Sequence, residues 1–341
     1  MESAWTVNHT RNIDIICMGR VAVDLYSEQI GSSLENTQTF RKYLGGCAGN
    51  IAVGASRLGL SSAMFSCVGT DAMGKFLKQE LLRESVDISL VKETTEHLTG
   101  LVLLGINPPD SFPLIFYRHN CADMQLKPAD TNIDFIAKSK SLLITGTGLS
   151  TENMRTTTHH AVKLAKSVQT QIVFDLDYRP VLWRLTELGD GESRYKISLE
   201  VSEQYQDMLA HCDLIVGTEE EMLIAGAGNT LAQALVSIRS RTAAPLIVKR
   251  GAEGCCIYLD DLNKPIISQP FPVKILNVLG AGDAFISGFL RGLLRGESWE
   301  TCARYGNASG AIVVTRHGCA PAMPYFNEIQ TFISDRESTH V

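Results

Sequence analysis

Short apolar runs alternate with longer amphipathic stretches along most of the chain. The short runs predict buried β-strands, which read as near-continuous hydrophobic segments. They are Ile13–Met18, Ala63–Val68, Ser141–Thr145, Gln171–Phe174, Leu214–Val216 and Pro245–Lys249. Stretches with a helical apolar period predict helices at Ala48–Leu58, Gly74–Glu84, Asn153–Ser167, Leu231–Arg239, Ala281–Leu294 and Thr301–Val314. This alternation predicts an α/β fold in which helices cover both faces of a mainly parallel central sheet.

Two regions break the alternation. Ser32–Tyr43 and His97–Arg118 look extended and have no helical pattern between apolar positions. We expect them to form a small separate sheet. The segment Leu188–Ile197 is rich in glycine and charged residues and predicts a surface loop.

Composition narrows the class of protein. A chain of 341 residues with 45% hydrophobic and 20% charged residues can bury a large core, as a globular protein does. The net charge of −6 argues against a nucleic-acid partner. No apolar run reaches the ~18 residues of a membrane span, and the polar segment Met1–Asn12 lacks a signal-peptide core. These features predict a cytoplasmic protein with no membrane partner.

The nine cysteines are scattered, without a Cys-x-x-Cys pair or a His/Cys spacing typical of zinc. Their number is odd and many lie in apolar stretches. We expect buried free thiols in a reducing compartment.

The run Leu279-Gly280-Ala281-Gly282-Asp283-Ala284-Phe285 carries the strongest chemical signal. A glycine-rich turn that opens a helix leaves backbone N–H groups unpaired, and these groups bind phosphate oxygens. A carboxylate there can take a proton from an attacking hydroxyl. The motif therefore suggests a kinase that acts on a small alcohol. The alternative is an ordinary helix start, where Asp is favoured.

A second glycine-rich helix entry, Gly45-Gly46-Cys47-Ala48-Gly49-Asn50, lies far upstream. Small residues let a ligand approach the backbone, and Asn offers a donor and an acceptor to hydroxyls. A helix cap with tight packing is the alternative. The stretch Gly69–Phe76 nearly matches a P-loop, but Phe76 stands where Ser or Thr would hold magnesium, so we reject that interpretation.

Together and in this order, the two motifs resemble the ribokinase-like (PfkB) carbohydrate kinases, from Ile13 to Pro324. The resemblance implies a three-layer sandwich with a small β lid. It implies one kinase domain, 13–324, with lid segments at about 32–43 and 97–118, flanked by terminal segments 1–12 and 325–341. Asp283 would be the catalytic base, and the amides of Gly280, Ala281 and Gly282 would form the anion hole.

The same resemblance implies the roles of further residues. Asp24 and Asn50 would bind sugar hydroxyls, with Gly45 and Gly46 allowing close approach. ATP would lie beside Lys249, Gly251, Gly254 and Asn307. Mg²⁺ would bridge its phosphates, with Glu221 acting through water. Glu220 is the alternative to Glu221, and the three adjacent glutamates could instead be a solvated helix start. Asn277-Val278-Leu279 stands where many relatives have Asp-Thr-Thr, so a monovalent cation stays open.

Arginines point to the substrate class. Arg118, which follows Tyr117, and Arg179 present planar forks suited to a carboxylate, and Arg20 is a weaker candidate. Surface salt bridges are the alternative. Similar patterns occur in family members that phosphorylate keto-deoxy sugar acids.

A fuller set of segments resembles the branch that acts on the terminal hydroxyl of 5-dehydro-2-deoxygluconate in inositol breakdown. They are Gly19-Arg20, Asp24-Leu25-Tyr26, Lys42–Gly46, Phe112–Met124 and Gly217–Glu221. The alternatives are 2-keto-3-deoxygluconate as the substrate or, in another class, a non-catalytic sugar or nucleotide sensor. A small sugar acid and ATP are the expected partners, and a homodimer stays open.

Overall fold

The computed structural model describes residues 5–108 and 111–338. Residues 1–4 and 339–341 of the predicted terminal segments lie outside the described residues. So do residues 109–110 of the predicted lid segment.

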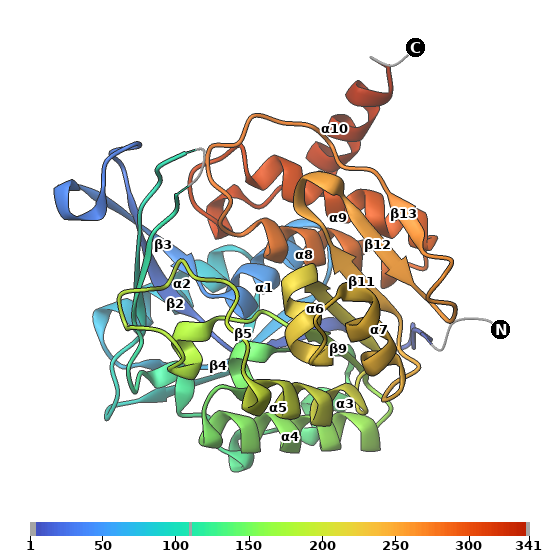
Figure 1. Ribbon diagram of the computed structural model, residues 1–341. Coiled ribbons are helices and arrows are strands. Elements are labelled where there is room, and N and C mark those ends of the chain that lie inside the picture. Colours follow the sequence, from blue (N-terminus) through green and yellow to red (C-terminus); the bar gives the residue numbers. More distant parts are fainter. Residues whose placement is uncertain (1–4, 109–110, 339–341) are drawn as a thin grey trace.

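A nine-stranded sheet forms the centre of the molecule (Figure 1). Its strands, from one edge to the other, are β13 (Ile266–Ser268), β12 (Cys255–Tyr258), β11 (Leu246–Lys249), β10 (Leu214–Thr218), β9 (Gln171–Asp175), β8 (Ser139–Thr145), β1 (Ile13–Met18), β4 (Ser62–Gly69) and β5 (Asp87–Thr94). The strands from β11 to β5 are parallel, whereas β12 and β13 add an antiparallel edge.

Helices cover both faces of this sheet. One hydrophobic core joins the sheet to α3 (Ile133–Ala137), α4 (Glu152–Ser167), α5 (Leu199–Leu209), α6 (Glu219–Gly226) and α7 (Leu231–Arg239). The opposite core joins it to α1 (Cys47–Arg57), α2 (Ala72–Arg83), α8 (Ala281–Leu293) and α9 (Trp299–Val313). Helix α10 (Phe326–Ser338) packs on α9 through a smaller apolar cluster. The predicted fold class is confirmed.

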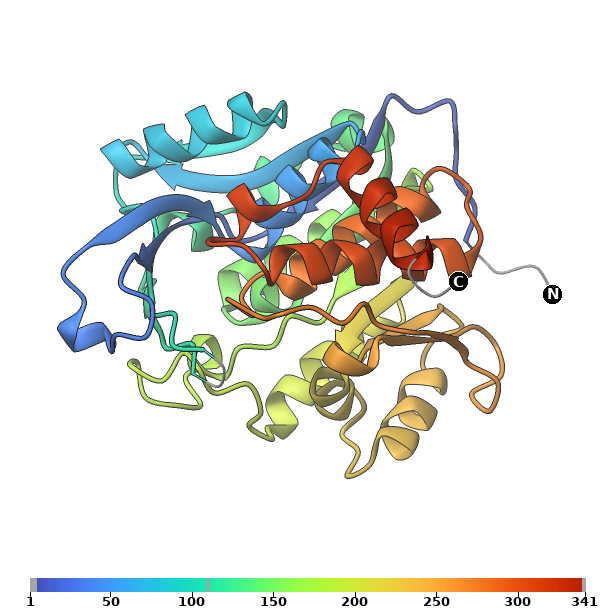
Figure 2. The ribbon, with the colours of Figure 1, turned by 90° about the horizontal axis from the view of Figure 1, so that it is seen from above.

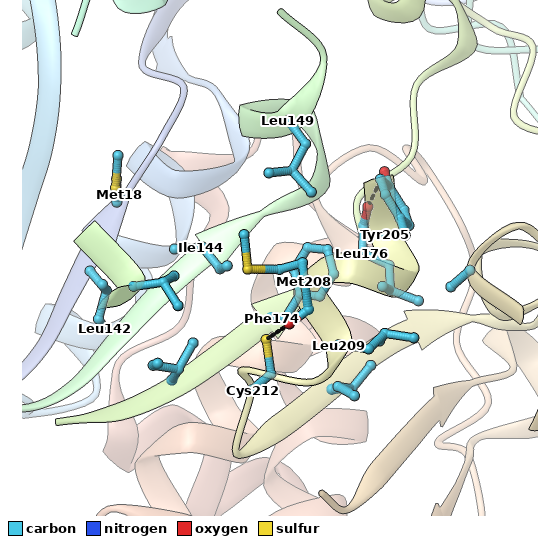
Figure 3. Packing of buried hydrophobic residues seen from close by; sticks show 14 of the residues in the cluster. Met18, Leu142, Ile144, Leu149, Phe174, Leu176, Tyr205, Met208, Leu209 and Cys212 are labelled. Carbon is cyan, nitrogen blue, oxygen red and sulfur yellow. Dashed lines mark hydrogen bonds between the residues drawn. The ribbon is translucent and has the colours of Figure 1, made fainter. Parts of the chain in front are cut away.

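Strand β1 shows why the sheet is buried on both sides. Ile16 and Met18 point into the first core, while Ile15 and Cys17 point into the second. In the first core, Met18, Leu142 and Phe174 come from three strands and belong to the same apolar cluster as Met208 of α5 (Figure 3). All nine cysteines are buried and free, as predicted.

A second, four-stranded sheet stands at one end of the molecule (Figures 1 and 2). Its order is β3 (Phe40–Gly45), β2 (Ala22–Ser27), β6 (Leu101–Leu104) and β7 (Leu114–Tyr117). The sequence predicted this sheet from the segments that contain β3, β6 and β7. It missed β2, which runs on from β1 after a short turn.

The segment Leu188–Ile197 is an irregular loop whose residues are mostly exposed or partly exposed, as predicted, but its centre is held against the small sheet. Gly191 is buried, and its N–H donates to the Leu114 carbonyl of β7 at 3.0 Å. A Cβ at this position would lie 2.3 Å from the same carbonyl oxygen. The segment therefore packs along the edge of the small sheet. Within the described parts of the chain, no helix has the length and apolarity needed to span a bilayer.

Candidate active site

The glycine turn at the start of α8 has the geometry expected of an anion-binding helix entry. Gly280 is the residue that precedes the helix and has a φ of 85°, a conformation that suits glycine. A Cβ there would lie 2.1 Å from Cys319 Sγ, so the close packing also requires glycine. The first amides of α8 have no intrahelical acceptor, and Asp283 lies in this first turn.

Helix α1 begins beside the same turn. Gly46 precedes it with a φ of 89°, and a Cβ would lie 2.6 Å from the Arg20 carbonyl oxygen. Asn50, in the first turns of α1, donates from Nδ2 to Asp283 Oδ2 at 2.7 Å. The N-termini of two helices thus converge on one carboxylate. Their dipoles both favour negative charge at this point.

Two cavities open on either side of the α8 turn. A small one, of about 50 Å³, contacts Gly280 and Asp283, whereas a large one, of about 570 Å³, contacts Ala281 and Gly282. The polar residues of the small cavity are Arg20, Asp24, Asn50, Arg179, Arg194 and Asp283. The large cavity is lined mainly by apolar residues. The turn is therefore placed to contact a different ligand on each side.

The carboxylates of the small cavity are electrostatically unusual. Burial and the charge of Asp177 raise the pKa of Asp283 to about 6, although the Asn50 hydrogen bond opposes this shift. Burial raises the pKa of Asp24 to about 7 against the lowering effect of Arg20. A Cβ on Gly45 would lie 2.0 Å from Asp24 Cγ, so Gly45 makes room for this carboxylate.

The small sheet forms a wall of the small cavity. Leu114 and Phe116 of β7 line it, and Tyr117, the next residue along, is 57% exposed and does not. Because side chains alternate along a strand, only one of these two neighbours can face the cavity. Tyr117, predicted to bind substrate, therefore does not face the small cavity. Phe116 lines it instead, and the centre of its ring lies 5.3 Å from Arg20 Cζ.

Arg118 also departs from its prediction. It is buried outside both cavities, and its Nε donates to Asp123 Oδ2 at 2.6 Å. Asp123 is fully buried and binds this guanidinium as a structural counterion. Arg118 is therefore not placed to meet a substrate in the small cavity.

Arg179, predicted to bind the substrate, lines the small cavity and also belongs to a charged network. Its Nη2 lies 2.9 Å from Asp177 Oδ1, and its Nη1 donates to the Tyr178 carbonyl at 3.0 Å. Burial alone would raise the pKa of Asp177, but Arg179 and Arg20 outweigh it and hold that pKa well below its usual range. Asp177 is thus a permanent anion beside the cavity.

Lys249 extends this network to the large cavity. Its Nζ lies 3.1 Å from Asp175 Oδ1 and 3.9 Å from Glu221 Oε2. A Cβ on Gly282 would lie 3.3 Å from the same nitrogen, so the lysine amine stands beside the α8 turn. The roles of Asp175 and Asp177 were not predicted, although both follow β9 in a visible Asp-x-Asp pattern.

The other residues predicted to bind a nucleotide also line the large cavity. Gly251 and Gly254 form one rim, and Asn307 lies on α9. The Asn307 amide donates to the carbonyls of Ser268 and Gln269 at 3.2 and 3.0 Å. It therefore fixes the wall of the cavity as well as lining it.

Glu221 is fully engaged by the backbone. Its Oε2 accepts from the Thr218 N–H at 2.8 Å and its Oε1 from the Tyr178 N–H at 3.1 Å. The Glu221 carboxylate therefore ties the backbone at Thr218 to the backbone at Tyr178. Among residues 5–108 and 111–338, no group of three or more His, Cys, Asp or Glu side chains is arranged to hold a metal.

The residues before the α8 turn use their polar groups internally. Asn277 is fully buried, and its Oδ1 accepts from the Leu279 N–H at 3.0 Å. Its Nδ2 donates to the Gly318 carbonyl at 3.4 Å. Asn277 therefore stabilises the turn and supplies no carboxylate for a monovalent cation.

Residues 12–325 match the pfkB family of carbohydrate kinases, and the chain belongs to this family. Its fold agrees with that assignment. A protein described as ribokinase II from E. coli, solved in complex with ATP and Mg²⁺, superimposes with a TM-score of 0.84 at 23% identity. The match covers 95% of this chain and 100% of the other.

Curated relatives point to a particular enzyme. The 5-dehydro-2-deoxygluconokinase of Bacillus licheniformis is 33% identical over 333 residues, which cover 97% of this chain and 98% of the relative. The protein of the same name from Bacillus subtilis is 31% identical over 332 residues, covering 96% and 98%. The chain is therefore a carbohydrate kinase whose full length resembles these two enzymes.

Proposed function

We propose that this enzyme transfers the terminal phosphoryl group of ATP to the terminal hydroxyl of 5-dehydro-2-deoxygluconate, a step of inositol breakdown. One observation carries the proposal. The turn that bears Asp283 contacts both a small polar cavity lined by arginines and a large, mainly apolar cavity lined in part by Lys249. The names of the relatives supply the particular acid.

The large cavity fits the nucleotide. Its apolar walls suit an adenine ring, and the Lys249 amine stands beside Gly282, where phosphates would approach the free amides of α8. Mg²⁺ would neutralise charge on the bridging phosphate oxygens. Because Glu221 is engaged by backbone N–H groups, we assign it to the water shell of that ion.

The small cavity orients the sugar. Asp24 and Asn50 are placed to bind its hydroxyls, and Asp283 accepts the proton of the hydroxyl that attacks. The amides of Gly280, Ala281 and Gly282 then stabilise negative charge on the transferring group. A pKa of about 6 leaves Asp283 mostly ionised at neutral pH, yet basic enough to take the proton. The small sheet excludes water from this reaction.

The test is ATP consumption by the purified enzyme with Mg²⁺, run in parallel on 5-dehydro-2-deoxygluconate, 2-keto-3-deoxygluconate, fructose and ribose. We expect strong preference for the first acid. Preference for the second acid would keep the mechanism and change the substrate, while preference for a neutral sugar would refute an acid-selective cavity. Tight binding of an acid without any ATP consumption would instead indicate a sensor.

A further inference from the structure

Two guanidinium groups in the small cavity make no hydrogen bond or ion pair with any residue that the structure describes. Arg20 is 7% exposed, and its buried Nε makes no hydrogen bond. Arg194 lines the same cavity from the segment that packs along β7. Across residues 5–108 and 111–338, the Arg194 side chain forms neither a hydrogen bond nor an ion pair. A buried N–H donor without an acceptor is costly, and two guanidinium groups with free donors at one cavity favour an anionic ligand.

The third arginine of the cavity is already occupied. Arg179 contacts Asp177 at 2.9 Å and the Tyr178 carbonyl at 3.0 Å, and its Nη1 lies 4.0 Å from Glu221 Oε1. It also acts on its neighbour. The Arg179 charge, followed by burial, lowers the pKa of Arg194 to about 9. An anion beside Arg194 would relieve this repulsion between like charges.

The carboxylates of the cavity restrict where that anion can bind. Asp24 and Asp283 would repel an acidic group, and both are suited to hydroxyls. Arg20 packs its guanidinium against the Phe116 ring, which belongs to the same wall as Leu114. The Gly191 N–H binds the Leu114 carbonyl at 3.0 Å and so holds the Arg194 segment against this wall.

We propose that Arg194, together with Arg20, binds the carboxylate of the sugar acid, and that Arg194 determines the preference of the enzyme for acids over neutral sugars. This inference rests on the proposed function, because it assigns the acidic group of that substrate to particular residues. Arg179 then supports the cavity wall through its contact with Asp177 and does not bind the carboxylate of the sugar acid. This role could not be predicted from the sequence, since Arg194 lies in a polar segment with no motif.

The experiment compares 5-dehydro-2-deoxygluconate with 5-deoxyfructose, its neutral analogue in which CH₂OH replaces the carboxylate. In Arg194→Met we expect kcat/KM for the acid to fall about 10- to 150-fold, the range for hydrogen bonds to charged groups. The value for the neutral analogue should change less than about three-fold. Lys196→Met removes an exposed positive charge from the same segment and should leave both values unchanged.

Two further variants separate charge from geometry. Arg194→Lys keeps the charge without the planar fork and should recover only part of the activity on the acid. Arg20→Gln should lower kcat/KM for the acid more than for the neutral analogue. The melting temperature of this variant reports whether the protein still folds around the buried site.

Each failure has a distinct meaning. A wild-type enzyme that uses both compounds equally would refute the proposed function itself. A wild-type preference for the acid that survives in Arg194→Met would overturn only the role of Arg194. An equal loss on both compounds in Arg194→Met would also overturn it, because a merely structural role predicts that result.

Discussion

Replacing Asn50 by Leu tests the electrostatic control of the catalytic base. Asn50 donates a 2.7 Å hydrogen bond to one oxygen of Asp283. This bond stabilises the ionised carboxylate and so lowers its pKa, while burial and Asp177 raise it to about 6. Leucine has a similar size but no donor. Its introduction removes only the stabilisation of the ionised form, and the pKa of Asp283 must therefore rise.

The size of the shift follows from the strength of the bond. A hydrogen bond to a charged group contributes about 1.5–3 kcal/mol, and one pKa unit corresponds to about 1.36 kcal/mol. The pKa of Asp283 should therefore rise by about one to two units in Asn50→Leu. Since the base must be ionised to act, kcat/KM should increase with pH through about 6 in the wild type. In the variant this rise should occur near pH 7–8.

The assay is the pH dependence of kcat/KM for the sugar acid between pH 4.5 and pH 9, at saturating ATP. The plateau at high pH will also fall, because Asn50 is assigned to a substrate hydroxyl, but the position of the rise reports the pKa alone. Asp24→Asn is the control, because Asp24 is a neighbouring carboxylate with a pKa of about 7. If Asp283 causes the rise of kcat/KM with pH, that rise should remain in this variant. A rise that stays near pH 6 in Asn50→Leu would refute the assignment of Asp283 as the base.

Three further predictions concern stability and binding. Asp283→Asn should lower kcat by about two to four orders of magnitude. Because the folded pKa of about 6 exceeds the unfolded value, ionisation of Asp283 destabilises the native state as pH rises. The free energy of unfolding of the variant, measured in urea, should therefore exceed that of the wild type by up to about 3 kcal/mol at pH 8. Below pH 4 the two should be equal. Gly45→Ala should raise KM for the sugar about ten-fold by displacing Asp24, whereas Gly189→Ala, whose Cβ meets nothing within 4 Å, should not. Lys249→Met should raise KM for ATP. It should also lower the free energy of unfolding by about 3–5 kcal/mol, because a buried carboxylate loses its cation. An unchanged KM would mean that the phosphates bind elsewhere.

The central sheet could be predicted from sequence because its strands are buried on both faces. In a chain where strands and helices alternate, a short, near-continuous apolar run such as Ile13–Met18 predicts a buried strand. The strand in the structure has the same bounds. The small sheet was harder, because one of its faces is partly exposed and its pattern is weak. Strand β2 begins so soon after β1 that its residues read as a turn.

Side-chain direction in the small sheet could not be predicted. A shift of one residue in register exchanges Phe116 and Tyr117 between the cavity and solvent, and composition does not distinguish the two. Arg118 was misassigned for a related reason. Its counterion Asp123 lies only five positions further along, but a carboxylate nearby in sequence does not reveal whether it is fully buried. Only the tertiary structure shows which arginine keeps a free guanidinium.

The charges around the α8 turn explain why the site needs so many cations. Asp24 and Asp283 keep raised pKa values because both are buried near other carboxylates. The phosphates of ATP would add negative charge beside Asp283 and drive its pKa higher still, toward a protonated and inactive base. The Lys249 amine and the converging N-termini of α1 and α8 oppose that effect at the phosphate side. At the sugar side, Arg20 and Arg194 would offset the charge of the proposed acid. The same cations that would hold the two substrates therefore also keep the base ionised, so weakening either group should raise the pKa that limits turnover.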